Sequence, residues 1–266
     1  MHRGGSLVTP SIVQSMGEIT IIGSGSSGNS YALDNGKEVL LIELGKPLKN
    51  VSLELGESMS RVVGCLVSHK HKDHAGFVEE ALKRGIDVWT CKDVVDDFGK
   101  KDPLLHILPL GEKTIIGDFI IEPISVRHGC ECYAFIIESP SIGKMLFITD
   151  CVSFPYRING VNHILIEANY DNDIILDHAS KGMKSHSQNE NHMEIGTTIK
   201  VLREHYSPCL MNVCLIHLSA EFSDARRFVS RVKEELGFYN VYYAEEKSKE
   251  MVEEEKKKIS LSKEIF

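Results

Sequence analysis

The 266-residue sequence predicts a mixed α/β domain, and two observations lead to this expectation. Short apolar runs of β-branched character, such as Val62–Val67, have the length of buried strands. They alternate with segments in which apolar residues fall at helical spacing, as in Ala75–Arg84. With 42% hydrophobic and 26% charged residues, the chain has enough apolar side chains to fill one sizeable core.

Three ranges near the N-terminus are predicted to be strands. Glu18–Gly23 is the first, and Ser30–Leu33 and Val39–Glu43 form a hairpin around Asp34-Asn35-Gly36. Between them, Gly23–Gly28 matches the pattern G-x-G-x-x-G. In dinucleotide-binding proteins this loop opens a helix, whose N-terminus meets the pyrophosphate. Because a strand is expected next, we reject a nicotinamide cofactor.

The remainder of the chain continues the alternation of strands and helices. The charged stretch Lys247–Lys263 has few apolar residues and predicts a solvated helix or a loose tail. Residues 1–15 lack the continuous apolar stretch of a secretory signal and are predicted to be an extension or tag remnant. Further strands are expected at Asp87–Thr90, within Leu105–Val126, and at Tyr133–Ile137, Lys144–Thr149, His163–Glu167, Val213–Ile216 and Val241–Tyr243, and helices at Lys92–Phe98, Asp171–Ser180, Met193–Ile199 and Ser223–Leu236.

A cluster of potential metal ligands lies directly after the strand Val62–Val67. The segment Ser68–Gly76 contains three histidines and one aspartate in the pattern H-x-H-x-D-H. A turn between a strand end and a helix start can direct several side chains at one point. Neutral imidazole and carboxylate are ligands that suit zinc, iron or manganese. A solvated loop rich in His and Lys is the alternative explanation.

Three more potential ligands, His128, Asp150 and His217, each follow an apolar strand. A lone histidine at a strand end is more often structural than metal-binding. Three such residues beside the first cluster favour a metal site, because a rigid sheet can place them together at its edge. The strands that they follow are Phe119–Val126, Met145–Thr149 and Val213–Ile216.

The order of these residues resembles the metallo-β-lactamase superfamily. H-x-H-x-D-H is followed by a His, then by Thr149-Asp150, and then by a His that opens His-Leu-Ser, and the resemblance covers about residues 17–245. It implies an αββα sandwich with two Zn²⁺ ions, or Mn²⁺ or Fe, at one edge of the sheets. By this resemblance, His69, His71 and His128 hold one ion, Asp73, His74 and His217 hold the second, and Asp150 bridges both.

Other residues acquire expected roles from the same resemblance. Glu43 stands where most relatives have Asp, an acid that supports a metal-binding histidine. Gly129 stands where relatives often have Asp, so one polar contact is expected to be absent. The Gly23–Gly28 loop resembles the Gly-Ser-Ser-Gly-Asn segment that borders the active site of superfamily nucleases. Cys130 and Cys132 lie near His128 in sequence, but the His/Asp set already accounts for two ions.

A second stretch suggests the reaction. His163–Tyr170 carries Glu167 to a strand end, and His192 precedes a predicted helix. The two resemble the Glu–His pair of the tRNA-maturase (RNase Z) branch, in which the His protonates the leaving oxygen and the Glu orients it. A structural polar residue at a helix start is the alternative for His192. The resemblance thus implies Asp73, His192 and Glu167 as catalytic residues.

Such a site implies hydrolysis. Two cations roughly 3.5–4 Å apart can clamp the attacking and leaving oxygens and lower the pKa of a bound water toward about 7. An added proton donor suits a phosphodiester, whose leaving alkoxide needs a proton, better than a lactam or thioester. We therefore expect a metal-dependent phosphodiesterase.

The expected substrate is a small cyclic nucleotide. No insertion suits a protruding substrate arm, and a net charge of −8 disfavours capture of long nucleic acid. The chain also resembles small phage and prophage proteins of this fold, which include cyclic-nucleotide phosphodiesterases that disarm defence signalling. A nuclease acting on RNA or DNA, a lactam or thioester hydrolase, and a non-catalytic nucleotide-binding protein remain alternatives.

Composition bounds the setting and the domain organisation. Seven scattered cysteines suggest no disulfide framework, which fits a reducing cytoplasm. No apolar run approaches the roughly 20 residues that cross a bilayer, so no membrane partner is expected. The resemblance implies a homodimer. We expect an extension at 1–15, a metallo-β-lactamase-fold domain at 16–246 and a charged tail at 247–266.

Overall fold

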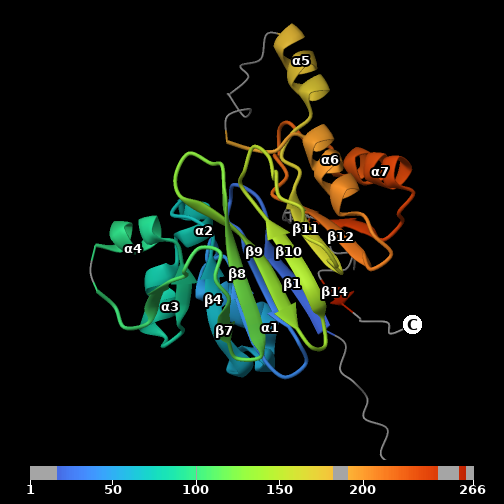
Figure 1. Ribbon diagram of the computed structural model, residues 1–266. Helices are drawn as coiled ribbons and strands as arrows, with labels where there is room; N and C mark the ends of the chain where they lie inside the picture. Colours follow the sequence, from blue (N-terminus) through green and yellow to red (C-terminus); the bar gives the residue numbers. More distant parts are fainter. Residues whose placement is uncertain (1–16, 100, 182–190, 245–257, 262–266) are drawn as a thin grey trace, which may run out of the picture.

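Two seven-stranded β-sheets with helices outside them form the protein (Figure 1). A computed structural model describes residues 17–99, 101–181, 191–244 and 258–261. The first sheet has the order β14-β1-β2-β3-β4-β5-β6, and the second has the order β13-β12-β11-β10-β9-β8-β7.

The strands of the first sheet are β1 (Gly17–Gly23), β2 (Ser30–Asp34), β3 (Val39–Ile42), β4 (Val62–Val67), β5 (Val88–Thr90), β6 (Leu105–Ile107) and β14 (Lys258–Leu261). Those of the second sheet are β7 (Thr114–Ile116), β8 (Phe119–Val126), β9 (Cys132–Ser139), β10 (Gly143–Ile148), β11 (His163–Glu167), β12 (Asn212–Ile216) and β13 (Val241–Tyr243). The helices are α1 (Leu48–Leu55), the 3-10 helix η1 (Gly56–Arg61), α2 (Lys72–Ala75), α3 (Val78–Lys83), α4 (Lys92–Phe98), α5 (Asn172–Ser180), α6 (Ile195–His205) and α7 (Ala225–Leu236).

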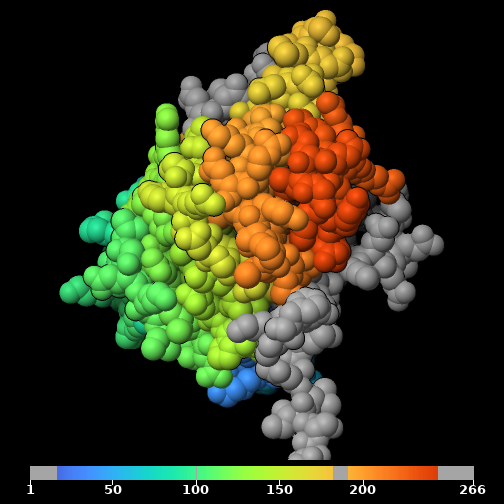
Figure 2. Space-filling view, turned by 45° about the vertical axis from the view of Figure 1, so that its right-hand side comes forward, coloured from blue at the N-terminus to red at the C-terminus, as the bar shows by residue number. Residues whose placement is uncertain are grey.

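The hydrophobic core has two parts. The larger part contains buried residues of both sheets, such as Leu41 of β3 and Phe147 of β10, together with apolar residues of α1, α3 and α4. The smaller part lies between the outer face of the second sheet and α6 and α7, where Leu202 and Phe228 are fully buried. Figure 2 shows α6 (orange) and α7 (red-orange) side by side over this face, with α5 (yellow) projecting beyond them.

Strand direction explains where the site lies. In the first sheet β3, β4, β5 and β6 run parallel, and in the second β10, β11, β12 and β13 run parallel. Parallel strands are buried on both faces, which explains their near-continuous apolar sequences. Their carboxyl ends share one edge of each sheet, which is where open α/β sheets bind ligands. The loops that carry the candidate ligands therefore converge there.

Several local expectations are revised by the structure. The helix expected at Ala75–Arg84 is two short helices, α2 and α3, because the chain turns at Gly76. Helix α7 begins at Ala225 and not at Ser223, and Asp224 is its N-cap, since Asp224 Oδ1 accepts a hydrogen bond from the N–H of Arg227 at 3.0 Å. Helix α6 begins at Ile195, so His192 precedes it in a turn.

The chain ends also differ from expectation. Strand β14 lies inside the predicted loose tail and pairs antiparallel with β1, where Ile19 faces Ile259. The predicted N-terminal extension at 1–15 lies outside the described residues, as do 247–257 and 262–266 of the predicted tail. Within the described ranges, no helix is long and apolar enough to cross a membrane.

Candidate metal centre

All the candidate ligands lie at one edge of the sandwich. The segment after β4, which includes α2, carries four of them, and the segments after β8, β10 and β12 carry one each. Their ligand atoms form two groups that share Asp150, and a third group joins Asp150 and His217 to Glu167 and His192. We call His69, His71 and His128 the first cluster, and Asp73, His74 and His217 the second cluster.

The first cluster brings three imidazoles together. His69 Nε2 lies 3.0 Å from His71 Nδ1, and His71 Nδ1 lies 3.1 Å from His128 Nε2. The Oδ2 atom of Asp150 is 3.7 Å from His69 Nε2 and 3.9 Å from His128 Nε2. One nitrogen thus approaches two others, although a neutral imidazole has a single N–H to donate. A shared cation is a suitable partner for all three lone pairs.

The second cluster has the dimensions of a tetrahedral metal site. The Nε2 atoms of His74 and His217 each lie 3.3 Å from Asp73 Oδ2. They lie 3.3 Å and 3.4 Å from Asp150 Oδ1. Ligands bonded at about 2.0–2.1 Å to a tetrahedral ion are roughly 3.3–3.4 Å apart. These four atoms therefore fit a zinc-sized ion.

Asp150 connects the two clusters with opposite oxygens, Oδ1 toward the second and Oδ2 toward the first. Burial alone would raise the pKa of this carboxyl, but the charges of His217 and His74 hold it well below its ordinary value. The group is therefore ionised and can neutralise part of the charge of two cations.

The histidines of the two clusters differ in what lies behind them. In the first cluster, Ser68 Oγ is 2.9 Å from His69 Nδ1, and His128 Nδ1 donates to the carbonyl oxygen of Asn191 at 3.0 Å. Both partners are neutral. Such partners fix the ring orientation and the tautomer of a metal-binding histidine.

In the second cluster the partners include buried carboxylates, although the amide Nδ2 of Asn169 also lies 3.1 Å from His217 Nδ1. Glu43 Oε2 lies 3.5 Å from His74 Nδ1, and Glu167 Oε1 lies 3.3 Å from His217 Nδ1. Both Glu43 and Glu167 are fully buried. The expected supporting role of Glu43 thus has a geometric basis, since its longer side chain reaches His74 from the end of β3.

Glu43 and His217 also share an unusual backbone conformation. Their φ angles are 65° and 52°, and they are the only non-glycine residues with positive φ in the part of the chain that the structure describes. L-residues rarely adopt this region, and such strain concentrates at functional sites. In both cases it aims a side chain at the second cluster from a strand end.

A Glu–His pair lies beside the clusters, as the sequence predicts. His192 Nδ1 is 2.7 Å from Glu167 Oε1 and 3.9 Å from Asp150 Oδ2. Burial alone would lower the pKa of His192, but the hydrogen bond to Glu167 and its charge raise it above the ordinary value. The His192 side chain remains 22% exposed, so a substrate can reach it.

Glu167 is held more firmly than the sequence indicates. Its Oε2 accepts hydrogen bonds from the N–H groups of Cys151 at 3.0 Å and Met193 at 3.1 Å. Its Oε1 faces both His192 and His217. This one carboxylate therefore links His192, a second-cluster histidine and the backbone that follows Asp150.

Some contributing residues were missed as participants. Asn29 Nδ2 lies 3.0 Å from His74 Nε2, and Asn169 Nδ2 donates to the carbonyl oxygen of His217 at 2.8 Å. Asn29 is the last residue of the Gly-Ser-Ser-Gly-Asn segment and Asn169 follows Glu167-Ala168, but the sequence assigned no role to either. Asn191 contributes through its backbone carbonyl oxygen, which every residue type has, so the sequence could not indicate its role.

The cysteines stay outside the clusters. No cysteine belongs to the groups of ligand atoms found among the described residues. Cys132 Sγ is 3.6 Å from His69 Nδ1, the nitrogen that faces away from the cluster. The absence of a side chain at Gly129 leaves room for Asn191, because a Cβ at position 129 would lie only 3.3 Å from Asn191 Oδ1.

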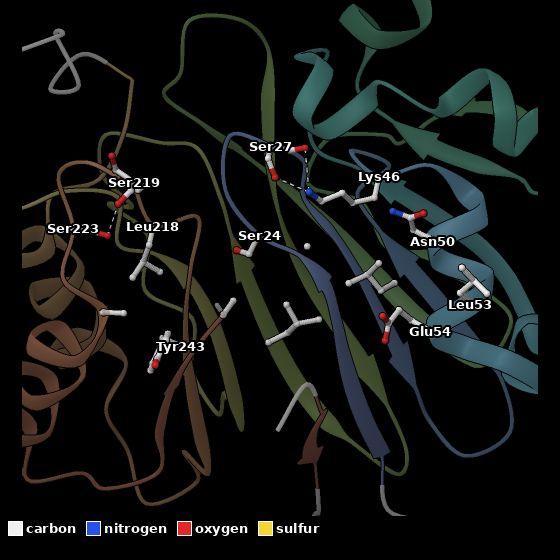
Figure 3. A pocket seen from close by; sticks show the side chains of 16 residues that line it. Ser24, Ser27, Lys46, Asn50, Leu53, Glu54, Leu218, Ser219, Ser223 and Tyr243 are labelled. Atoms are coloured by element: carbon white, nitrogen blue, oxygen red, sulfur yellow. Dashed lines mark hydrogen bonds between the residues drawn. The ribbon is translucent and has the colours of Figure 1, made fainter. Parts of the chain in front are cut away.

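An open groove of about 860 Å³ is lined by residues of β1 and α1 on one side and by residues after β12 on the other, and its lining contains none of the seven candidate ligands (Figure 3). It begins at Ser24 and at Ser219, two positions beyond His217, and passes Lys46 and Tyr243. Lys46 Nζ donates to Ser27 Oγ at 2.6 Å, as the dashed line in Figure 3 shows. The groove therefore offers hydroxyl, cationic and aromatic groups.

The two-sheet architecture and the ligand-bearing edge define the metallo-β-lactamase fold, which confirms the αββα expectation. The metallo-β-lactamase fold protein YhfI from Bacillus subtilis superposes with a TM-score of 0.67 at 16% identity, covering 86% of this chain and 97% of that protein. The short form of human tRNase Z superposes with a TM-score of 0.60 at 13% identity, covering 92% of this chain and 99% of that protein.

Sequence comparison adds a relative of the same name from each of two strains of Streptococcus pneumoniae. Exodeoxyribonuclease WalJ from Streptococcus pneumoniae serotype 2 is 30% identical over an alignment that covers 59% of this chain. The alignment spans 64% of the length of that relative. No protein-family model matches the chain.

Proposed function

We propose that the protein is a metal-dependent hydrolase of phosphodiester bonds. His69, His71 and His128 would hold one divalent ion, and Asp73, His74 and His217 the other, with Asp150 shared between them. The tetrahedral spacing of the second cluster and the three converging imidazoles of the first support this assignment. When bound, such a pair of ions activates water and polarises a phosphoryl oxygen.

The observation that carries the choice of a phosphodiester is the 2.7 Å contact between His192 and Glu167. Because Nδ1 of His192 is bonded to Glu167, its Nε2 is the nitrogen that can give a proton to the leaving oxygen. Glu167 holds the ring in this orientation and stabilises its protonated form. An alkoxide leaving group needs such a donor, and a positioned acid contributes about 10²–10⁴-fold in rate.

We further propose that the substrate is the end of a nucleic acid strand, which was the alternative to cyclic nucleotides at the level of sequence. The relative named an exodeoxyribonuclease supports this choice. Exposed Lys70 and Lys72 flank His71 at the rim of the site, and Lys70 Nζ lies 3.7 Å from Asp93 Oδ2.

A single panel of substrates tests the proposal. Purified protein is incubated with end-labelled single- and double-stranded DNA, RNA, cyclic mononucleotides and cyclic dinucleotides, with and without a chelator. His192→Ala serves as a matched variant that leaves both clusters intact. We expect chelator-sensitive release of mononucleotides from DNA ends, reduced in the variant.

The other outcomes are equally informative. Cleavage of cyclic nucleotides alone would support the small-nucleotide alternative and overturn the proposed substrate. Turnover of only β-lactams or thioesters would overturn the phosphodiesterase itself. Binding of nucleotides without any turnover, with both ions present, would favour a non-catalytic nucleotide-binding protein.

A further inference from the structure

The Gly23–Gly28 loop and the adjoining Asn29 match a motif without an assigned role in the proposed chemistry. The dinucleotide interpretation does not apply, because strand β2 and not a helix follows the loop. The loop crosses the metal edge of the first sheet and is nevertheless tied to both sheets. These ties end on residues of the second cluster.

One end of the loop holds Asp73. The N–H of Asn29 donates to the Asp73 carbonyl oxygen at 2.7 Å, and Asn29 Nδ2 donates to Asp73 Oδ2 at 3.4 Å. Asn29 is itself fixed, because its Oδ1 accepts from the N–H of Gly25 at 2.8 Å and its Nδ2 donates to the Gly25 carbonyl oxygen at 3.2 Å. Asn29 is fully buried.

The other end of the loop holds His217. Ser24 Oγ accepts a hydrogen bond from the N–H of His217 at 2.8 Å, across 193 positions of sequence. Tyr31, whose hydroxyl donates to Ser24 Oγ at 2.8 Å, orients that oxygen. This contact supports the residue whose φ of 52° aims its ring at the second cluster.

Backbone packing makes the loop a close-fitting support. A Cβ on Gly28, whose φ is +131°, would lie 2.0 Å from the carbonyl oxygen of Gly45. A Cβ on Gly45 would lie 1.8 Å from the carbonyl oxygen of Asp73. Glycine at both positions lets the loop, the end of β3 and the Asp73 turn stack backbone against backbone, where the N–H of Gly45 donates to the Asn29 carbonyl oxygen at 2.8 Å.

We infer that this loop is a positioning element for the divalent ion of the second cluster, with Ser24 and Asn29 as its positioning residues. Asp73 comes from the first sheet and His217 from the second, and their ligand atoms must stay 3.3 Å apart. The loop contacts both residues directly, so it sets this separation. The first cluster has no contact with Ser24 or Asn29 among the hydrogen bonds of the described residues.

The inference rests on the proposed metal centre, and its test separates the two. Each cluster is first isolated: His71→Ala removes a ligand of the first cluster, and Asp73→Ala removes one of the second. Metal-free protein is titrated with Zn²⁺ against a chromophoric chelator. Ser24→Ala or Asn29→Ala is then added in each background.

The expected result is selective. In the His71→Ala background, Ser24→Ala and Asn29→Ala should each weaken Zn²⁺ binding by about 10–100-fold, the usual effect of losing a partner of a ligand. In the Asp73→Ala background neither should change the affinity of the remaining ion. Equal losses in both backgrounds, or no loss in either, would overturn the inference.

Matched controls come from the opposite end of β2 and its neighbourhood. Asn35 and Ser139 are also buried, and Asn35 Nδ2 donates to Ser139 Oγ at 3.3 Å. Asn35→Ala and Ser139→Ala should lower thermal stability comparably but leave Zn²⁺ affinity unchanged. Loss of affinity in these controls would show a general effect of destabilisation and contradict the inference.

Tyr31→Phe covers the case in which Ser24→Ala does not fold. It removes only the hydroxyl, which lies 2.8 Å from Ser24 Oγ and 3.4 Å from Asn29 Oδ1, and keeps the ring, which packs edge-on against Phe147 with centroids 5.4 Å apart. We expect a selective loss of Zn²⁺ affinity in the His71→Ala background, smaller than for Ser24→Ala. Unchanged affinity here would count against the role of Ser24. Wild-type protein that binds fewer than two ions would instead contradict the metal centre.

Discussion

The two clusters are built from similar residues but placed in different surroundings. The first opens to solvent through the exposed His71 and is backed by a hydroxyl and a backbone carbonyl. The second contains the buried His74 and His217, each with a buried glutamate behind it. Since the number of charged groups around an ion tunes its affinity, the second cluster should retain its ion more firmly.

This difference assigns different tasks to the two positions. An ion held by neutral partners at an exposed rim can exchange and can meet an incoming substrate. We expect an ion that is enclosed by carboxylates, and supported by the Gly23–Gly28 loop as proposed, to fix the geometry of the site. Glu167 belongs to both aspects of the site, because the same oxygen faces His217 and the proton donor His192.

Replacing Asp150 with alanine should weaken metal binding in both clusters and so remove the difference between them. Its two oxygens face different clusters, so its loss weakens both ions at once. We expect bound metal to fall well below two equivalents by elemental analysis. The loss of activity should exceed the roughly 10²–10⁴-fold effect of losing a general acid. Two firmly bound ions in Asp150→Ala would contradict the shared position of this residue.

His192→Ala should separate proton donation from metal binding. Both ions should remain, because His192 lies 3.9 Å from Asp150 and belongs to neither cluster. The rate of DNA hydrolysis, in which the leaving group is an alkoxide, should fall by about 10²–10⁴-fold. On bis(p-nitrophenyl) phosphate, whose leaving group needs no proton, the loss should be small. Equal losses on the two substrates would mean that His192 positions substrate or supports the fold.

Glu43→Gln and Glu167→Gln form a matched pair for the second cluster. Each removes a buried charge behind one histidine, so each should weaken one Zn²⁺ by about 10–100-fold in a chelator titration. Only Glu167→Gln should also show the leaving-group dependence expected for His192, in milder form. A leaving-group effect in Glu43→Gln would show that the dependence reflects metal loss alone.

Stepwise removal of metal from the wild-type protein with a chelator should reveal the difference in Zn²⁺ affinity between the two clusters. We expect two Zn²⁺ affinities that differ by about tenfold or more, because surrounding carboxylates strengthen the second cluster. His71→Ala should remove the weaker affinity and keep the stronger one. If His71→Ala instead removes the stronger affinity, the ranking of the clusters is reversed.

Ser68→Ala should give the smallest effect. Its hydroxyl is a neutral partner of His69, and a neutral hydrogen bond contributes about 0.5–1.5 kcal/mol, against about 1.5–3 kcal/mol for a charged one. We therefore expect the weaker Zn²⁺ affinity to fall by no more than about tenfold, with the stronger one unchanged. A loss as large as that of Glu43→Gln would erase the difference between the clusters.

Local sequence determined much of this protein. The run Val62–Val67 followed by H-x-H-x-D-H predicted a strand that delivers ligands to a sheet edge, and the structure places them there. Glu167 was expected at a strand end and Asp171–Ser180 as a helix, as observed. Periodicity and ligand type are local properties, so residue order alone carries them.

Tertiary structure alone decided which groups surround each ion. The tie from Ser24 to His217 spans 193 positions and that from Asn29 to Asp73 spans 44, and no local pattern encodes such distances. The same holds for Asn191, which acts through a backbone carbonyl. It also holds for β14, which lies in the charged stretch expected to be a solvated helix or a loose tail but pairs with β1. These contacts depend on how two sheets pack and on backbone groups that every residue possesses, so residue type could not reveal them.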